Sequence, residues 1–322
     1  MGRFNPDHYV EISLHFGCDL TCVHCMIAGI KDHLRPESAE RFQEILEHNR
    51  RHRKWRGLVL TGSEITLRRD LPELARRARQ HGFEHVRIQT HGMRLAEAAY
   101  CRSLAEAGVD EYYISLAASE AAAHDAITGR PGSFEKTLRG FENLENLDGV
   151  TVLSNTVITT RSVSHLPGIV ERLRHLRRLV QMEFWSYWPM RETDERGLVA
   201  SHPDVAPTLR QAVRMARALG RAVELKNFPE CLLGEEADAL DNNQPYLFID
   251  PSFWPEFQRN GFGRCAHRAA CGSRRCLGLN AAYLAKFGWQ ADRFSPLPPC
   301  PPTTPGALQE YGGVRPTASP GS

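Results

Sequence analysis

Apolar runs and amphipathic stretches alternate along the chain from Tyr9 to about Asn227. Short runs rich in aliphatic and aromatic residues predict β-strands, and stretches with apolar residues three or four positions apart predict helices. The predicted strands cover residues 9–16, 57–62, 85–90, 111–117, 150–159 and 179–188. The predicted helices lie around residues 42–46 and over 71–82, 95–108, 133–147, 164–176 and 208–220. Ser133 is the predicted N-cap of the helix that it opens.

Six strand–helix units joined by short loops favour one parallel sheet with right-handed crossovers. A complete eight-fold barrel would need two more units, and the sequence offers one further candidate strand, at residues 222–227. The predicted fold is therefore α/β, a partial (β/α)6 barrel similar to a TIM barrel. Ligands of parallel α/β sheets bind at the C-terminal ends of the strands, so we expect the functional site at that edge.

The alternation of strands and helices stops after residue 227, which divides the chain into three predicted parts. Residues 1–227 form the barrel. Residues 228–295 form a small, irregular, cysteine-rich extension that contains Cys231, Cys265, Cys271 and Cys276. Residues 296–322 are rich in proline, a composition typical of a disordered tail.

Composition narrows the class of protein. The chain has 322 residues with 40 basic and 38 acidic side chains, and this balance argues against nucleic acid as the main partner. No apolar run is long enough to cross a membrane, and the N-terminus has no apolar signal-peptide core. We therefore expect a cytoplasmic protein whose thiols stay reduced. Nine cysteines in such a protein indicate metal binding rather than disulfides.

Three of these cysteines, Cys18, Cys22 and Cys25, follow the first predicted strand. A structural zinc site needs four ligands, and His24 or His33 could supply the fourth. Iron–sulfur clusters are also held by thiolates. Three thiolates would leave one iron of a cubane cluster open to a small molecule, which gives a chemical reason for a set of three. Both kinds of site stay open on spacing alone.

The spacing C-x3-C-x2-C after the first strand of a six-fold β/α chain resembles the radical SAM superfamily. Gly62-Ser63-Glu64 follows the second strand, where the superfamily has Gly-Gly-Glu, and Ile65 replaces the usual proline. Thr90-His91-Gly92 stands at the end of the third strand in place of Thr-Asn-Gly. The resemblance covers roughly residues 8–190.

Polar residues further along the chain continue the resemblance. Ser115 and Asn155 match polar contacts at the fourth and fifth strands. In HDAITGRPGSF, Thr128 occupies a position usually held by arginine, and Arg130 is expected to supply that charge. His24 precedes the last cysteine of the motif, where an aromatic residue usually lies near the adenine.

The resemblance implies that Cys18, Cys22 and Cys25 bind a [4Fe-4S] cluster and that S-adenosylmethionine (SAM) binds the open iron. One electron, from a donor such as flavodoxin or ferredoxin, would cleave SAM to methionine and a 5′-deoxyadenosyl radical, which takes a hydrogen atom from the substrate. The implied SAM contacts are His24, Gly62, Ser63, Glu64, Ser115, Arg130 and Asn155.

Four later cysteines form a second group, because C-x5-C-x4-C at Cys265, Cys271 and Cys276 follows Cys231. Four thiolates suit a closed metal site. The resemblance points to a Twitch-like or SPASM-like extension that holds one auxiliary [4Fe-4S] cluster, for electron transfer or for sulfur chemistry. Zinc is the second interpretation, although the spacing differs from paired C-x2-C zinc motifs.

The sequence therefore predicts a radical SAM enzyme, an oxidoreductase or transferase with a small polar substrate from natural-product biosynthesis, of sugar or nucleoside type. Only 17 residues precede Cys18, too few for the leader-binding domain that peptide-modifying members often carry. One alternative is a maturase of ribosomal peptides that uses a separate leader-binding protein. The other is a non-catalytic, zinc-stabilised binding protein, which the departures from the superfamily motifs favour, at Ser63, Ile65, His91 and Thr128.

Overall fold

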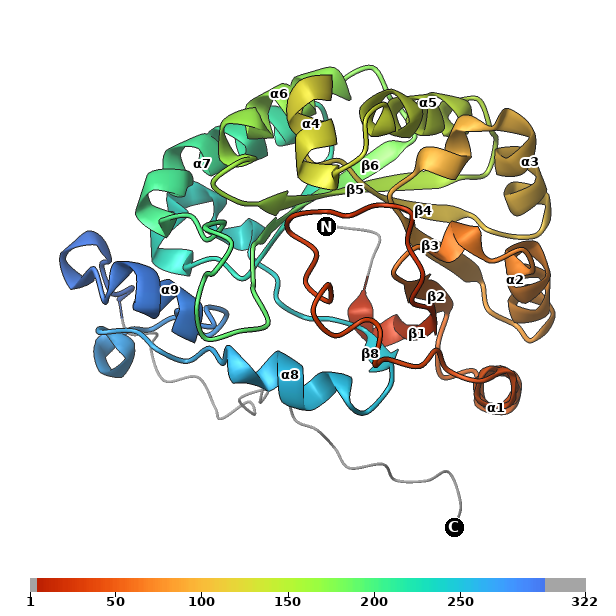
Figure 1. Cartoon of the computed structure of the whole chain (residues 1–322), viewed down its shortest axis with the longest axis horizontal. Helices are drawn as coiled ribbons and strands as arrows, with labels where there is room; N and C mark the ends of the chain where they lie inside the picture. The colour runs from red at the N-terminus through yellow and green to blue at the C-terminus, as the bar shows by residue number, and fades with distance from the viewer. Residues whose placement is uncertain (1–4, 299–322) are drawn as a thin grey trace, which may run out of the picture.

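The computed structural model describes residues 5–298, and its strands form one curved sheet with helices along its outer side (Figure 1). The eight strands of this part of the chain lie in the order β7-β6-β5-β4-β3-β2-β1-β8, and all neighbours are parallel. The strands are β1 (Tyr9–His15), β2 (Gly57–Gly62), β3 (His85–Thr90), β4 (Glu111–Ser115), β5 (Thr151–Ile158), β6 (Leu179–Ser186), β7 (Ala222–Lys226) and β8 (Tyr246–Phe248).

Helices alternate with the first seven strands, and two more follow β8. They are α1 (Ala39–His52), α2 (Leu71–Gln80), α3 (Ala98–Glu106), α4 (Ala121–Thr128), α5 (Ser133–Glu145), α6 (Leu166–Arg172), α7 (His202–Ala218), α8 (Phe253–Arg259) and α9 (Ala281–Phe287). None of the helices between residues 5 and 298 has the length and apolar character needed to span a bilayer.

The two faces of the sheet differ in polarity. Val10, Ile12 and Leu14 of β1 belong to the main apolar core, and the register places Val10 beside Leu58 and Ile12 beside Leu60 of β2. Successive side chains of a strand point to opposite faces, so the alternate positions line the inside of the curve. These positions are largely polar: Glu11, Ser13, Thr61, Arg87, Gln89, Glu111, Tyr113, Asn155, Glu183 and Glu224. The apolar face packs the helices, and the polar face surrounds the space in which the site lies.

The predicted partial barrel is confirmed, and the candidate strand at residues 222–227 is β7. β8 was not predicted, because a run of three residues is too short to show a periodicity. It pairs with β1, so the chain beyond residue 227 contributes a strand to the barrel sheet. The division at residue 227 stays a prediction. The predicted tail covers residues 296–322, and its part from residue 299 onward lies outside the described residues.

The N-terminus of α5 corrects one detail of the sequence analysis. The N-cap is Gly132, with φ +78°, and Ser133 lies in the first turn. Asp125 of α4 accepts hydrogen bonds from the Gly132 and Phe134 N–H groups and from the Ser133 hydroxyl. The carboxylate of a neighbouring helix therefore satisfies the free N–H groups that Ser133 was expected to cap.

Helix α7 starts six residues before its predicted limit. The sequence analysis does not predict these first turns because they contain Pro203 and Pro207. This early start places His202 in a buried contact with the C-terminal region. The His202 ring stacks on Tyr283 of α9, with 4.5 Å between ring centroids, and its backbone N–H donates to the Tyr283 hydroxyl at 3.1 Å. Burial lowers the pKa of His202 from 6.5 to about 3.

We expect His202 to make the protein less stable in weak acid. Its folded-state pKa lies below its unfolded value, so the stabilising contribution is complete above pH 6.5 and is lost as the pH falls towards 3. Between pH 6.5 and 5 the loss is about 2 kcal/mol. Urea unfolding of His202→Phe, compared with wild type at both pH values, should show a smaller loss in the variant. Equal losses in both proteins would show that another group titrates.

Candidate active site

The loop between β1 and α1 carries Cys18, Cys22 and Cys25 and lies inside the curve of the sheet (Figure 1). Within the loop, the Cys25 N–H donates to the Cys22 carbonyl at 3.1 Å, and the Leu20 N–H donates to Cys18 Sγ at 3.4 Å. Burial, together with the neighbouring Cys25 and Cys18 thiols, raises the pKa of Cys22 to about 12. A cationic group that bound all three sulfurs would remove this penalty on the thiolate form.

The end of helix α4 holds this loop in place. The Thr21 N–H donates to the Thr128 carbonyl at 3.1 Å, and the Val23 N–H donates to the Ile127 carbonyl at 2.8 Å. Gly129 follows with φ +71°, and a Cβ at this position would collide with Thr21. Helix α4 was not predicted as a separate element, yet it supplies the surface on which the cysteine loop rests.

Gly62-Ser63-Glu64 lies beside the entry to the cysteine loop. The Ser63 N–H donates to the His15 carbonyl at 2.7 Å, and the Glu64 N–H donates to the Gly17 carbonyl at 3.1 Å. Gly62 has φ +146°, and a Cβ there would collide with the His15 carbonyl oxygen. A glycine is therefore required at the first position of this stretch, in agreement with the motif.

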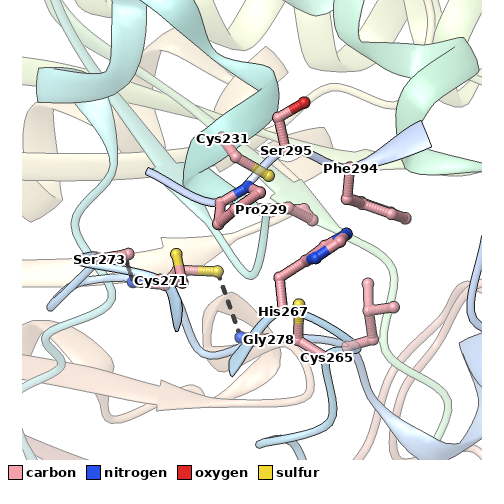
Figure 2. A pocket seen from close by; sticks show the side chains of 12 residues that line it. Pro229, Cys231, Cys265, His267, Cys271, Ser273, Gly278, Phe294 and Ser295 are labelled. Atoms are coloured by element: carbon pink, nitrogen blue, oxygen red, sulfur yellow. Dashed lines mark hydrogen bonds between the residues drawn. The ribbon is translucent and has the colours of Figure 1, made fainter. Parts of the chain in front are cut away.

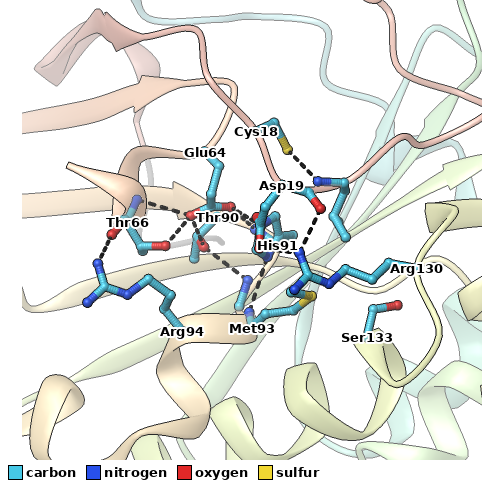
Figure 3. A network of polar contacts seen from close by, with 12 residues as sticks. Cys18, Asp19, Glu64, Thr66, Thr90, His91, Met93, Arg94, Arg130 and Ser133 are labelled. Atoms are coloured by element: carbon cyan, nitrogen blue, oxygen red, sulfur yellow. Dashed lines mark hydrogen bonds and ion pairs between the residues drawn. The ribbon is translucent and has the colours of Figure 1, made fainter.

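The Glu64 carboxylate is fully buried and joins the ends of β2 and β3 (Figure 3). It accepts hydrogen bonds from the Thr66 N–H at 3.0 Å, the Thr66 hydroxyl at 2.5 Å, the Thr90 hydroxyl at 2.6 Å and the His91 N–H at 2.8 Å. The predicted contact between Glu64 and SAM stays a prediction. In this structure the two oxygens of Glu64 organise the protein around the site.

Next to Cys18, a chain of ionic contacts runs from Glu64 through His91 and Asp19 to Arg130 (Figure 3). His91 Nε2 lies 2.8 Å from Asp19 Oδ1 and 3.1 Å from Glu64 Oε2. Arg130 Nη1 donates to Asp19 Oδ2 at 2.8 Å and to the Asp19 carbonyl at 2.9 Å. Burial alone would lower the pKa of His91, but the hydrogen bond with Cys18, the charge of Glu64 and the hydrogen bond with Asp19 raise it to about 9.

The sequence predicts no role for Asp19 and marks His91 only as a departure from Thr-Asn-Gly. The only sequence signal for Asp19 is that it directly follows Cys18. Arg130, predicted to contact SAM, is placed beside the cysteine loop by its pairing with Asp19.

Three of the predicted SAM contacts keep buried polar atoms that no described residue satisfies. They are His24 Nδ1, Ser63 Oγ and Asn155 Oδ1. Ser115 is exposed and lies beside Asn155 in the register of β4 and β5. A buried polar atom without a partner costs about 1–3 kcal/mol, so these atoms fit a polar ligand that would hydrogen-bond to them.

The sequence of residues 12–173 matches the radical SAM superfamily. The chain belongs to the radical SAM superfamily. The matched residues include the cysteine triplet, Gly62-Ser63-Glu64 and the polar network of Figure 3. The family is one of enzymes that use a [4Fe-4S] cluster and SAM, and the residues described above fit both groups.

Two curated radical SAM relatives illustrate the similarity. A probable GTP 3′,8-cyclase of Methanopyrus kandleri is 33% identical over 170 residues, 53% of this chain and 54% of the relative. The mycofactocin maturase MftC of Mycolicibacterium smegmatis is 31% identical over 153 residues, 48% of this chain and 38% of the relative. The chain thus spans about half or less of the length of these relatives.

Solved structures share the fold of this radical SAM chain. SuiB of Streptococcus suis, bound to S-adenosylmethionine, superposes with a TM-score of 0.55 at 14% identity, over 73% of this chain and 53% of SuiB. At this identity the likeness supports the barrel and its curvature alone.

The four C-terminal cysteines of this radical SAM chain line one cavity together with His267 (Figure 2). The Gly278 N–H donates to Cys276 Sγ at 3.3 Å, and the Cys276 N–H donates to the Ser273 hydroxyl at 3.0 Å. Burial and the neighbouring Cys276 raise the pKa of Cys231 to about 11. Cys231 and Cys276 are 45 positions apart in the sequence, and the fold places both at this cavity.

Proposed function

We propose that this protein cleaves SAM reductively at the Cys18–Cys22–Cys25 loop and abstracts a hydrogen atom from a small polar substrate of sugar or nucleoside type. The observation that carries the proposal is the cysteine loop beside Gly62-Ser63-Glu64, with buried polar atoms of His24, Ser63 and Asn155 left for a ligand. The cluster and SAM supply the radical chemistry. The chain's own residues hold these groups, and the curved sheet shields them from water.

The polar inner face of the sheet supports a small polar substrate. Glu183 is buried on β6 and accepts hydrogen bonds from the Tyr113 hydroxyl at 2.7 Å, Trp185 Nε1 at 2.8 Å and Gln181 Nε2 at 2.9 Å. Glu183 and its three partners make this part of the inner face polar, and a polar lining suits a ligand with several hydrogen-bonding groups. The name of the Methanopyrus relative, a GTP 3′,8-cyclase, agrees with a substrate of nucleoside type.

A maturase of ribosomal peptides is the second candidate, because MftC is named a maturase and one SuiB structure contains the precursor peptide SuiA. Formation of 5′-deoxyadenosine in the presence of nucleosides, sugars or a precursor-type peptide separates the two functions. Transfer of deuterium from a labelled sugar or nucleoside into 5′-deoxyadenosine would support the first. Transfer only from a labelled peptide would overturn it.

The C-terminal cysteines are proposed to hold one auxiliary [4Fe-4S] cluster, for electron transfer or as a source of sulfur. Cys231, Cys265, Cys271 and Cys276 line one cavity, so four thiols are available to a single metal group. Their C-x5-C-x4-C spacing differs from the paired C-x2-C of zinc motifs, which favours a cluster over zinc.

Replacing both Cys231 and Cys276 with alanine should lower the iron content of the reconstituted protein from about eight to about four atoms per chain. Formation of 5′-deoxyadenosine with dithionite should persist, because the first cluster is kept. Iron and acid-labile sulfide analysis measures the change. Cys101→Ala, at a buried cysteine of α3, is the matched control and should keep about eight atoms. A wild-type protein that holds zinc and only about four irons per chain would contradict the proposal.

A further inference from the structure

A connecting segment, residues 187–201, runs from β6 to α7 and reaches back to the cysteine loop. Nη1 of Arg196 donates to the carbonyl oxygens of Val23 and Cys25, each at 3.0 Å. These carbonyls flank His24, so a single guanidinium nitrogen fixes the backbone on both sides of that residue. A charged donor makes stronger hydrogen bonds than a neutral one.

The connecting segment is itself anchored at Asp194. The Asp194 carboxylate has only 2% of its side-chain surface exposed. It accepts hydrogen bonds from the Leu198 N–H at 2.9 Å and the Val199 N–H at 2.8 Å, and it pairs with Lys286 Nζ of α9 at 2.7 Å. Lys286 Nζ also donates to the Val199 carbonyl at 2.8 Å. The turn that presents Arg196 is therefore fixed by the C-terminal region.

The same segment takes part in an apolar cluster that includes Val23 of the cysteine loop and Cys231 of the C-terminal group. This cluster contains Leu198 and Val199 of the connecting segment and Tyr283 of α9, with Val23 and Cys231 at its edges. Val23 lies between Cys22 and His24, and Cys231 is a proposed ligand of the auxiliary cluster. The packing of the connecting segment is thus shared between the two proposed metal sites.

We propose that Arg196 is a positioning residue that holds the Cys22–Cys25 turn in its binding geometry, and that Asp194 and Lys286 link this geometry to the C-terminal region. The functional importance of this positioning rests on the proposed function, because that function places the first cluster on the cysteines of this turn. The structural content of the proposal concerns contacts within the chain alone, so it is testable on protein without iron.

Hydrogen–deuterium exchange of iron-free protein is the first test. In Arg196→Ala, amides of residues 22–30 should exchange about tenfold faster than in wild type, and Asp194→Asn should cause a similar increase because it frees the turn that presents Arg196. Arg196→Lys should restore part of the protection, since it keeps a charged donor. Glu192→Ala, at an exposed charged residue of the same segment, is the matched control and should leave exchange unchanged.

The reconstituted proteins give the second readout. Electron paramagnetic resonance of the reduced first cluster should broaden or shift in Arg196→Ala, while the signal assigned to the auxiliary cluster stays the same. Unchanged exchange over residues 22–30 in Arg196→Ala would overturn the inference, whatever the activity. Faster exchange with no iron bound by the triplet in wild type would keep the positioning role and overturn the proposed function instead.

Discussion

Formation of 5′-deoxyadenosine should be abolished when Cys18, Cys22 and Cys25 are all replaced by alanine. The triplet has no substitute, because its three thiols lie on one loop, and the C-terminal cysteines line a separate cavity. The iron content should fall by about four atoms per chain. The assay is anaerobic reconstitution, reduction with dithionite, addition of SAM and chromatography of the products.

The Cys231→Ala/Cys276→Ala protein is the control for this loss, since it should also lose about four irons and yet keep SAM cleavage. SAM cleavage by the triple variant would contradict the assignment of the first cluster. A fully reconstituted wild type that never cleaves SAM, even with candidate substrates, would favour a binding protein over an enzyme.

Glu64→Gln should lower the free energy of unfolding by about 3 kcal/mol. Each oxygen of the Glu64 carboxylate accepts a backbone N–H, one from Thr66 and the other from His91. An amide must turn its NH2 group towards one of these donors, so a buried donor loses its acceptor whichever way the side chain is oriented. Urea unfolding of iron-free protein measures the loss without interference from the cluster.

Glu73→Gln is the matched control for this substitution, because Glu73 is exposed on α2 and pairs with Arg76. Its replacement should change stability little. A loss below about 1 kcal/mol in Glu64→Gln, less than an unpaired buried donor costs, would show that the carboxylate is held loosely. It would then be available to a ligand, as the superfamily motif implies.

Sequence reasoning found the parts of the site that are contiguous in the chain. Cys18, Cys22 and Cys25 carry their own spacing. Gly62 stands in a contiguous motif, and the motif keeps glycine there because the backbone conformation is one that only glycine adopts readily. The six strand–helix units were found because each has a clear period. The outward-facing residues of β1, such as Val10 and Ile12, fit that pattern because they pack against helices.

The residues that were missed act through partners distant in sequence. Arg196 bonds to backbone carbonyls of Val23 and Cys25, and a carbonyl leaves no trace in residue type. His91 and Asp19 meet only because β3 ends beside the cysteine loop. Strand β8 has three residues, too few for a pattern, and its place beside β1 depends on the closing of the whole sheet.

The pairing of β8 with β1 joins two segments that are synthesised far apart in time. Val10 pairs with Tyr246, so β1 is synthesised long before β8, the strand that covers its outer edge. Pairings between such distant residues form slowly. The cysteine triplet leaves the ribosome long before the strand that completes the sheet beside it. We therefore expect the first iron–sulfur cluster to be inserted after translation, into a chain that already includes its C-terminal region.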